Sequence, residues 1–310
     1  MKPYNKGKAM NKEASLKLSG YISKKIIETS PTVSYTSSEL EKEKKKYPKE
    51  QLDELTKEGY YNGDFETFYV VKKLCDLLNI WDYADDDFLK KLFTNAKRLK
   101  KSEFYEDKYL KNIKVPTVSN GNILLTNACY EKGEFFQYDM PKLSEDIVVP
   151  KLAFFSSRVF FPSVYEGNMP WVSVCPSEIN SMQIDVDKAE GRCLVLGLGL
   201  GYYPYIISLL EKVKTITIVE ISEKIIILFE KYILPQFEHK DKIKLIHADA
   251  IEFMKTVERD EYDYCYADIW EGQVDGAPLY KQIKKHENRL PYTRFAYWIE
   301  DEIKWYIENN

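Results

Sequence analysis

The sequence contains few histidines, no closely spaced cysteines and no long apolar run, and each absence narrows the range of functions. Its three histidines and five cysteines are scattered, without a CxxC pair or a metal-ligand spacing, which argues against a zinc site or a disulfide framework. The longest apolar stretches are far shorter than the ~20 residues of a membrane helix. The basic start lacks the apolar core of a secretory signal. We therefore expect a cytoplasmic protein without a metal site or a membrane-spanning segment.

A surplus of positive charge is also missing. Lys plus Arg number 45 and Asp plus Glu number 49, which gives a formal net charge of −4 at pH 7. Proteins that hold nucleic acid by its phosphates usually carry a basic surplus, so the balance argues against a nucleic-acid partner. Hydrophobic residues make up 44% and charged residues 30% of the 310 residues, as in ordinary globular proteins.

Three segments of different texture follow one another along the chain. Residues 1–114 are rich in charged residues and, from about Ser30, show apolar residues at helical spacing. Ser38–Glu41 predicts a capping box at a helix start. The acidic Asp85–Asp87 suits a helix start better than a metal site. Residues 115–188 contain short strand-like runs between turn signals such as Asn120-Gly121. Residues 189–310 alternate strand and helix patterns. The expected fold is an α/β Rossmann-like domain with a mostly parallel sheet, preceded by a small β-rich region and an N-terminal helical region.

The most informative segment is CLVLGLGLGYYPY, residues 193–205. An apolar strand leads into a loop that contains Gly197, Gly199 and Gly201, and a helix pattern follows. Glycine permits positive φ and lets the backbone lie against a ligand, while a helix N-terminus offers free N–H groups. On its own, the pattern is a weak signal, because glycines after a strand can also form a tight turn.

Acidic residues at the ends of the next three strands add to this signal. Glu220 ends the second strand and is suited to accept both hydroxyls of a ribose, Asp249 follows the third strand and suits an adenine amino group, and Asp268 ends the fourth. Open α/β sheets bind ligands at the carboxyl ends of their strands. Each acid alone could be a strand-end cap, but together they predict a nucleoside-containing ligand.

The spacing of the glycines distinguishes between nucleoside ligands. A dinucleotide fingerprint would place a small residue at position 202, where this chain has Tyr202. The G-x-G-x-G loop with three strand-end acids instead resembles the class I S-adenosylmethionine-dependent methyltransferases, over about Gly191 to Tyr280. The resemblance implies S-adenosylmethionine as the cofactor. The residues that it assigns to this cofactor are Gly197, Leu198, Gly199, Leu200, Gly201, Tyr202, Glu220, Ile221, Asp249, Ala250 and Asp268.

Within this superfamily the sequence looks most like the spermidine synthases. The segments VLGLGLG, TIVEIS, a DA pair and ADIWEGQVDGAPLY follow the order and spacing of their motifs. Asp268 and Glu271 repeat their two acids three residues apart. The resemblance therefore gives Asp268 the role of the base that takes a proton from an attacking amine, with Glu271 as the second candidate. A purely orienting role for Asp268 stays open.

Three departures from the spermidine synthases limit this resemblance. Their glycine loop carries an acid where this chain has Leu200, and Trp171–Asn180 does not match their glutamine-containing substrate segment. Few residues follow Asp268, so we expect the last part of the sheet to be abbreviated or supplied from elsewhere. Residues 1–114 lie outside the resemblance altogether.

Three functions stay open at this stage. The first is methyl transfer from S-adenosylmethionine to a small-molecule acceptor, with Tyr202, Tyr203 and Tyr280 as candidate walls of the pocket. The second is an aminopropyltransferase that uses decarboxylated S-adenosylmethionine, and Leu200 separates it from the first. The third is a non-catalytic nucleoside-binding or adaptor protein. A homodimer is compatible with all three, and the sequence does not identify the acceptor.

Overall fold

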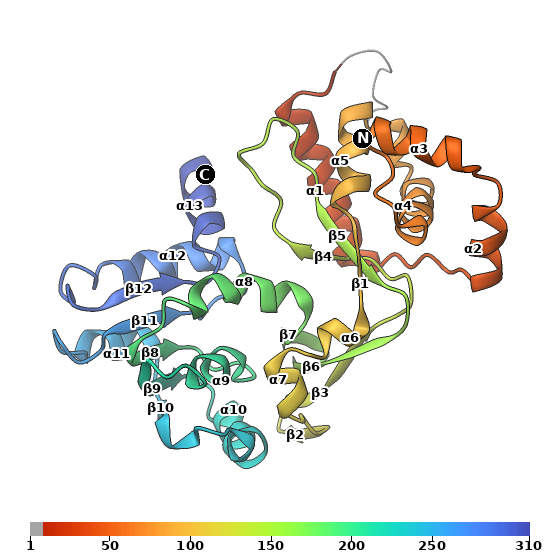
Figure 1. Cartoon of the computed structure of the whole chain (residues 1–310). Helices are drawn as coiled ribbons and strands as arrows, with labels where there is room; N and C mark the ends of the chain where they lie inside the picture. The colour runs from red at the N-terminus through yellow and green to blue at the C-terminus, as the bar shows by residue number, and fades with distance from the viewer. Residues whose placement is uncertain (1–8) are drawn as a thin grey trace. The chain divides into compact units, whose positions relative to one another are not determined.

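The computed structural model describes residues 9–310, so residues 1–8 of the predicted helical region lie outside the described residues. The chain divides into two compact units, which Figure 1 shows. Unit 1 contains the residues up to Phe104 and residues 129–160, and unit 2 contains residues 105–128 and 161–310. Residues 115–188, which the sequence predicts to be one β-rich region, contribute strands to both units.

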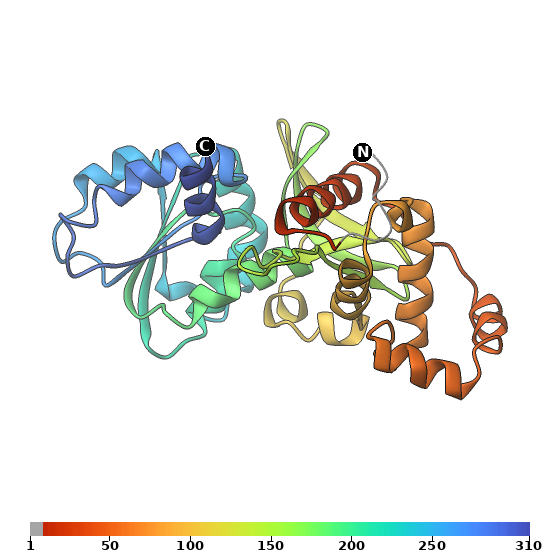
Figure 2. The same cartoon turned by 90° about the horizontal axis from the view of Figure 1, so that it is seen from above.

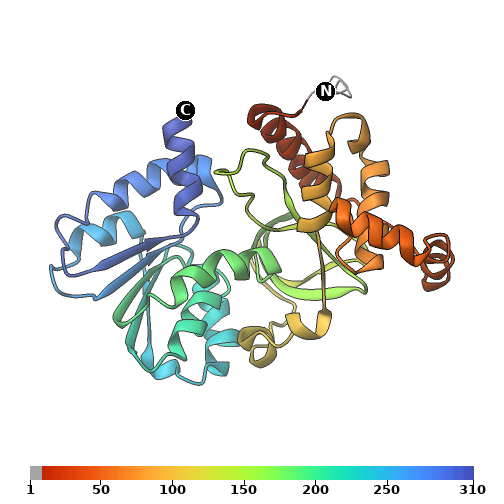
Figure 3. The same cartoon turned by 45° about the horizontal axis from the view of Figure 1, so that its top comes forward.

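Unit 1 combines several helices with a three-stranded sheet. Its helices are α1 (Lys12–Thr29), α2 (Ser37–Lys44), α3 (Lys49–Glu58), α4 (Phe65–Leu77), η1 (Ile80–Asp82), α5 (Asp86–Asn95) and α6 (Lys101–Phe104). The three-stranded sheet has the order β1-β5-β4, with β1 (Lys97–Leu99), β5 (Lys151–Phe155) and β4 (Phe136–Asp139). Leu18, Phe88 and Phe154 belong to the core between α1, α5 and this sheet (Figure 3).

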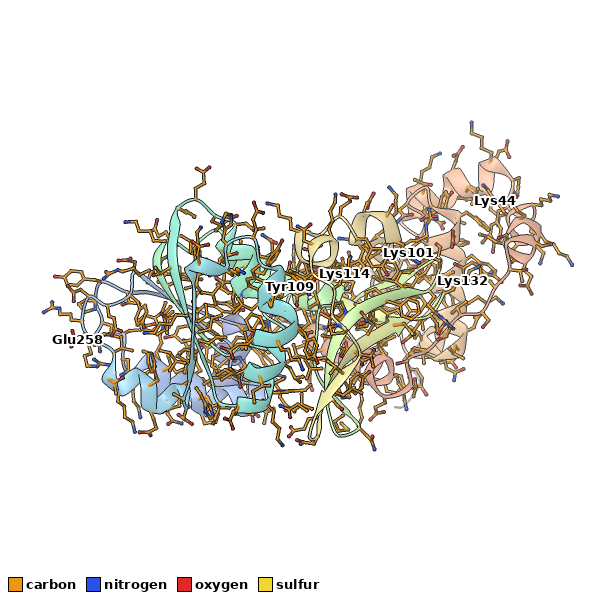
Figure 4. All side chains as sticks on the ribbon, turned by 90° about the horizontal axis from the view of Figure 1, so that it is seen from below. Lys44, Lys101, Tyr109, Lys114, Lys132 and Glu258 are labelled. Atoms are coloured by element: carbon orange, nitrogen blue, oxygen red, sulfur yellow. The ribbon has the colours of Figure 1, made fainter. Side chains whose placement is uncertain are left out.

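Capping residues define the helix starts in unit 1. α2 begins at a capping box of Thr36 and Glu39, two residues before the predicted one: the Glu39 N–H donates to Thr36 Oγ1 at 3.1 Å, and the Thr36 N–H donates to Glu39 Oε2 at 2.7 Å. None of the residues of α2 is buried, and Figure 4 shows Lys44 among its extending side chains. Asp85 caps α5 by accepting from the Phe88 N–H at 2.9 Å. Within residues 9–310, no three His, Cys, Asp or Glu side chains are grouped to hold a metal.

Unit 2 begins with α7 (Lys108–Asn112) and contains most of a second sheet, of order β2-β3-β6-β7. Its strands are β2 (Val118–Asn120), β3 (Ile123–Tyr130), β6 (Val159–Glu166) and β7 (Met169–Ser173). The predicted Asn120-Gly121 turn joins the antiparallel strands β2 and β3. The next element is α8 (Pro176–Val186), a helix in a stretch that the sequence analysis assigned to β structure. That assignment is wrong for these residues.

The C-terminal part of unit 2 is an open α/β fold with a fully parallel sheet, which confirms the predicted Rossmann-like arrangement. The order is β10-β9-β8-β11-β12. The strands are β8 (Gly191–Leu196), β9 (Val213–Glu220), β10 (Ile243–His247), β11 (Tyr264–Ala267) and β12 (Arg294–Tyr297). The chain leaves β8 toward β9 on one side and reaches β11 on the other. This change of direction at β8 creates the crevice in which such sheets bind ligands.

Helices cover both faces of this sheet (Figure 2). On one face lie α11 (Ala250–Thr256), α12 (Gln273–Lys284) and α13 (Glu300–Asn309), whose core includes Met254 and Ile283. The other face carries α8, α9 (Tyr202–Ser208) and α10 (Glu223–Leu228), followed by η2 (Phe229–Ile233), η3 (Leu234–Gln236) and η4 (Lys240–Lys242). None of the helices in the described part of the chain is long and apolar enough to cross a membrane.

Candidate functional site

The carboxyl ends of β8, β9 and β11 open into one cavity of about 450 Å³ within unit 2. This volume lies in the range of ~300–1,000 Å³ that is typical of small-molecule sites. Of the predicted site residues, the structure brings to its wall Gly197, Leu198, Gly199, Leu200, Tyr202, Glu220, Ile221, Asp249, Ala250, Asp268 and Glu271. Gly201 is not in the wall. It precedes α9 with φ of +72°, and a Cβ there would lie 2.3 Å from Phe229 Cε2, so it serves loop packing.

The glycine loop passes directly against the backbone of Asp268. Gly197 has φ of +96°, and a Cβ there would lie 2.0 Å from the Asp268 carbonyl oxygen. The Asp268 N–H in turn donates to the Leu196 carbonyl oxygen at 2.9 Å. A side chain at position 197 would therefore be strained by its φ and would force the loop away from the end of β11.

Glu220 is buried at the end of β9 and binds the loop. Glu220 is only 5% exposed. Oε2 accepts from the Leu198 N–H at 3.0 Å, and Oε1 accepts from the Ser222 N–H at 2.7 Å. A carboxylate offers about four lone-pair sites, so these two bonds leave acceptor capacity for ligand hydroxyls. The same side chain can thus fix the loop and bind a ribose.

Asp249 is a helix cap that also lines the cavity. Its Oδ1 accepts from the Glu252 N–H at 2.9 Å and caps α11. Asp249 and the following Ala250 also line the cavity. One carboxylate oxygen therefore stabilises the helix start, while the residue as a whole stays available at the cavity wall.

The cavity contains a further acid that the sequence patterns did not reveal, the half-buried Glu178 on α8. Burial raises the pKa of Asp268 well above its ordinary value, and the neighbouring Glu178 carboxyl raises it further. Burial also raises the pKa of Glu178 to about 7. Pro176 at the first helical position and an acid in the first turn are the sequence signals that could have revealed this helix.

The wall of the cavity is acidic and aromatic. Among the described residues that form it there is no lysine, arginine or histidine. Carboxyl groups in a poorly solvated space and aromatic faces both favour a cation. The acids are Glu178, Glu220, Asp249, Asp268, Glu271 and Asp275, and the tryptophans are Trp171, Trp270 and Trp298. The site is therefore suited to a positively charged ligand.

The two candidate bases differ in their surroundings. Asp268 is half-buried, whereas Glu271 is exposed at the margin of the cavity. The backbone N–H groups of Glu271 and Gly272 donate to Asp275 at 2.8 Å and 3.0 Å, an arrangement that starts α12. Burial makes Asp268 the better placed of the two for proton transfer away from bulk water.

The predicted aromatic walls are only partly in place. Tyr202 and Tyr203 line the cavity. Tyr280 does not: its hydroxyl donates to Glu300 at 2.7 Å, and its ring packs edge-on against Tyr297 in the core beside α12 and α13. The sequence spacing could not distinguish a core tyrosine of α12 from a pocket residue.

Residues that lie outside the segment resembling the methyltransferases also contact the glycine loop and the start of α9. The hydroxyl of Tyr109, a residue of α7 labelled in Figure 4, donates to the Leu200 carbonyl oxygen at 2.5 Å. Tyr202 donates to Asp107 at 2.9 Å. In addition, Trp171, Val172, Ser173 and Val174 form part of the cavity wall. The stretch Trp171–Asn180 thus contributes to the site although it does not match the substrate segment of the spermidine synthases.

Comparisons with known proteins concern the Rossmann-like part of the chain. The family described as "Spermine/spermidine synthase domain" matches residues 177–285, about a third of the chain. No curated protein matches. A solved structure of precorrin 8W decarboxylase from Methanobacterium thermoautotrophicum is similar with 15% identity and a TM-score of 0.31, covering 42% of this chain and 68% of that one. The domain match supports a fold of the S-adenosylmethionine-dependent methyltransferase type near spermidine synthase, and a transferase activity of that kind.

Replacing Glu220 tests the nucleoside side of the cavity. We expect Glu220→Ala to weaken S-adenosylmethionine binding at least about tenfold, because a buried charged acceptor contributes ~1.5–3 kcal/mol and the loop also loses its contact at Leu198. Isothermal titration calorimetry measures the affinity. Glu223→Ala, at an exposed acid three residues along the chain, is the matched control and should bind as the wild type does. Unchanged affinity in Glu220→Ala would remove Glu220 from the site.

Proposed function

We propose that unit 2 binds S-adenosylmethionine and transfers its methyl group to a small amine held beside Asp268. The observation that carries this proposal is the composition of the single cavity at the strand ends, where six carboxyl residues and no basic residue meet among the described wall residues. A sulfonium and a protonated amine are both cations. The same acidic wall therefore favours both partners of the reaction.

The residues present fit the nucleoside. Glu220 has acceptor capacity left for ribose hydroxyls, and Asp249 uses its Oδ1 as a helix cap. The glycine loop forms one side of the cavity; Glu220 binds its backbone, and its Gly197 lies against the Asp268 carbonyl. When bound, S-adenosylmethionine supplies a methyl group that its sulfonium has already made electrophilic. The tasks left to the protein are in-line positioning and removal of a proton.

Asp268 is the proposed base. Without a ligand, burial and the neighbouring Glu178 favour its neutral form, because both raise its pKa. A cation in the cavity acts in the opposite direction and lowers the pKa of a nearby carboxyl. Asp268 thus gains the ability to accept a proton from the attacking nitrogen when the cationic ligands are in place.

The domain match favours a second candidate, an aminopropyltransferase that uses decarboxylated S-adenosylmethionine. The two donors differ by one carboxylate. An acid in the loop would bind the ammonium of the decarboxylated donor and repel the carboxylate of S-adenosylmethionine. Leu200, which is apolar and 2% exposed at this place, does neither, and this supports methyl transfer. A purely nucleoside-binding protein would need no further space around Asp268, whereas the cavity extends to Glu178, Trp270 and Leu279.

Replacing Asp268 tests the chemical role. We expect Asp268→Asn to bind S-adenosylmethionine within a few-fold of the wild type and to lower turnover by ~10²–10⁴, the usual contribution of a general base. The measurement is the formation of S-adenosylhomocysteine with a panel of small amines. Glu271→Gln is the control, and it should retain most of the activity. A larger loss in Glu271→Gln than in Asp268→Asn would exchange their roles, and a collapse of binding in folded Asp268→Asn would make Asp268 a cofactor ligand.

Replacing Leu200 tests the choice of donor. The wild type should bind S-adenosylmethionine more tightly than its decarboxylated form, and Leu200→Asp should narrow or reverse this preference, because like charges a few ångströms apart in a partly buried site cost several kcal/mol. Leu200→Asn separates the effect of charge from that of polarity and should keep the wild-type order. Titration of both donors against all three proteins measures the preference. Tighter binding of the decarboxylated donor by the wild type, together with its use on putrescine, would contradict methyl transfer.

A further inference from the structure

Tyr266 has a buried hydroxyl that no group of the described chain satisfies. It lies on β11 two residues before Asp268, and both residues line the cavity. Residues two apart on a strand share a face of the sheet. Tyr266 is 1% exposed, and its hydroxyl oxygen has no hydrogen-bond partner among the described residues. Because a buried unpaired hydroxyl destabilises a protein, this position points to a partner that comes from outside the chain.

The Tyr266 ring is held in place by its neighbours. It stacks on the ring of Tyr203, with centroids 3.8 Å apart and an angle of 14° between the planes. The hydroxyls of Tyr203 and Tyr264 lie 2.8 Å apart, and each contacts the Asp185 carbonyl oxygen, at 3.0 Å and 3.1 Å. The two neighbouring tyrosines are therefore satisfied inside the protein. Tyr266, which lines the cavity as Tyr203 does, differs from both in that its hydroxyl has no hydrogen-bond partner among the described residues.

The surroundings of the Tyr266 hydroxyl define the chemistry of a suitable partner. Burial raises the pKa of Tyr266 well above its ordinary value, and Asp268, Asp185, Tyr264 and Glu178 raise it further. Asp268 and Glu178 line the same cavity. One phenol oxygen and two carboxyl groups form a set of hydrogen-bond acceptors. A primary ammonium group, with three N–H donors, matches such a set.

We propose that Tyr266 is a specificity-determining residue, whose hydroxyl accepts a hydrogen bond from the acceptor's amine nitrogen and aligns this nitrogen beside Asp268. The inference rests on the proposed function, since it takes the acceptor to be an amine. It assigns the selection of the reacting nitrogen to a hydroxyl on β11 rather than to the carboxyl groups alone. An apolar side chain at position 266 would leave that nitrogen with one acceptor fewer.

The test uses Tyr266→Phe, with putrescine as the probe and S-adenosylhomocysteine bound. Removing an unpaired buried hydroxyl should leave the thermal unfolding temperature unchanged or raise it. Affinity for S-adenosylhomocysteine should stay within about twofold of the wild type, and affinity for putrescine should fall about tenfold or more, as expected for one hydrogen bond to a charged group. Tyr264→Phe is the matched control. It removes a satisfied hydroxyl outside the cavity wall, so it should lower the unfolding temperature and leave putrescine affinity unchanged.

The outcomes separate this inference from the function on which it rests. Wild-type putrescine affinity in Tyr266→Phe would overturn the inference and leave the proposed function intact. A loss of stability in Tyr266→Phe as large as in Tyr264→Phe would also overturn it, because the hydroxyl would then have a partner inside the protein. If the wild type bound S-adenosylhomocysteine but not putrescine, this result would contradict the proposal that the acceptor is an amine. It would also contradict the role proposed for Tyr266, which depends on an amine acceptor.

Discussion

The site depends on one buried carboxylate that binds two backbone N–H groups. Glu220, at the end of β9, accepts from Leu198 in the glycine loop and from Ser222 at the start of α10. On its other side the loop lies against the carbonyl of Asp268, where glycine at position 197 leaves just enough room. The loop is therefore fixed between the ends of two strands. The parallel sheet therefore sets the spacing between Glu220, the proposed ribose ligand, and Asp268, the proposed base.

The electrostatics of the cavity follow from the same convergence of strand ends. Burial raises the pKa of Asp268, and the neighbouring Glu178 carboxyl raises it further; burial also raises the pKa of Glu178 to about 7. Such a wall favours the cationic groups of a ligand, such as a sulfonium or an ammonium. A preference for positively charged ligands is thus a property of the wall as a whole. This preference comes from several carboxyl residues together rather than from a single ion pair.

Sequence patterns predict the parts of this protein in which local signals agree with the tertiary structure. The alternation of strands and helices in residues 189–310 was predictable because short apolar runs there are separated by helical patterns. The strand-end acids were predictable because β-strand polarity places them at one edge. Helix α8 was missed because Pro170 and Pro176 resemble the punctuation of a β-rich stretch, and Glu178 was missed with it. The positions of Tyr109 and Tyr280 depend on packing between distant segments, which no local pattern encodes.

The central claim is that the loop at Gly197, the end of β9 at Glu220 and the start of α11 at Asp249 form one nucleoside site. Hydrogen–deuterium exchange of the wild-type protein with and without S-adenosylhomocysteine tests this most directly. The account predicts slower exchange in residues 197–201, 220–222 and 249–251 together, and unchanged exchange in α2 and α3 of unit 1. Binding without protection in these three segments, or with protection confined to other parts of the chain, would contradict it.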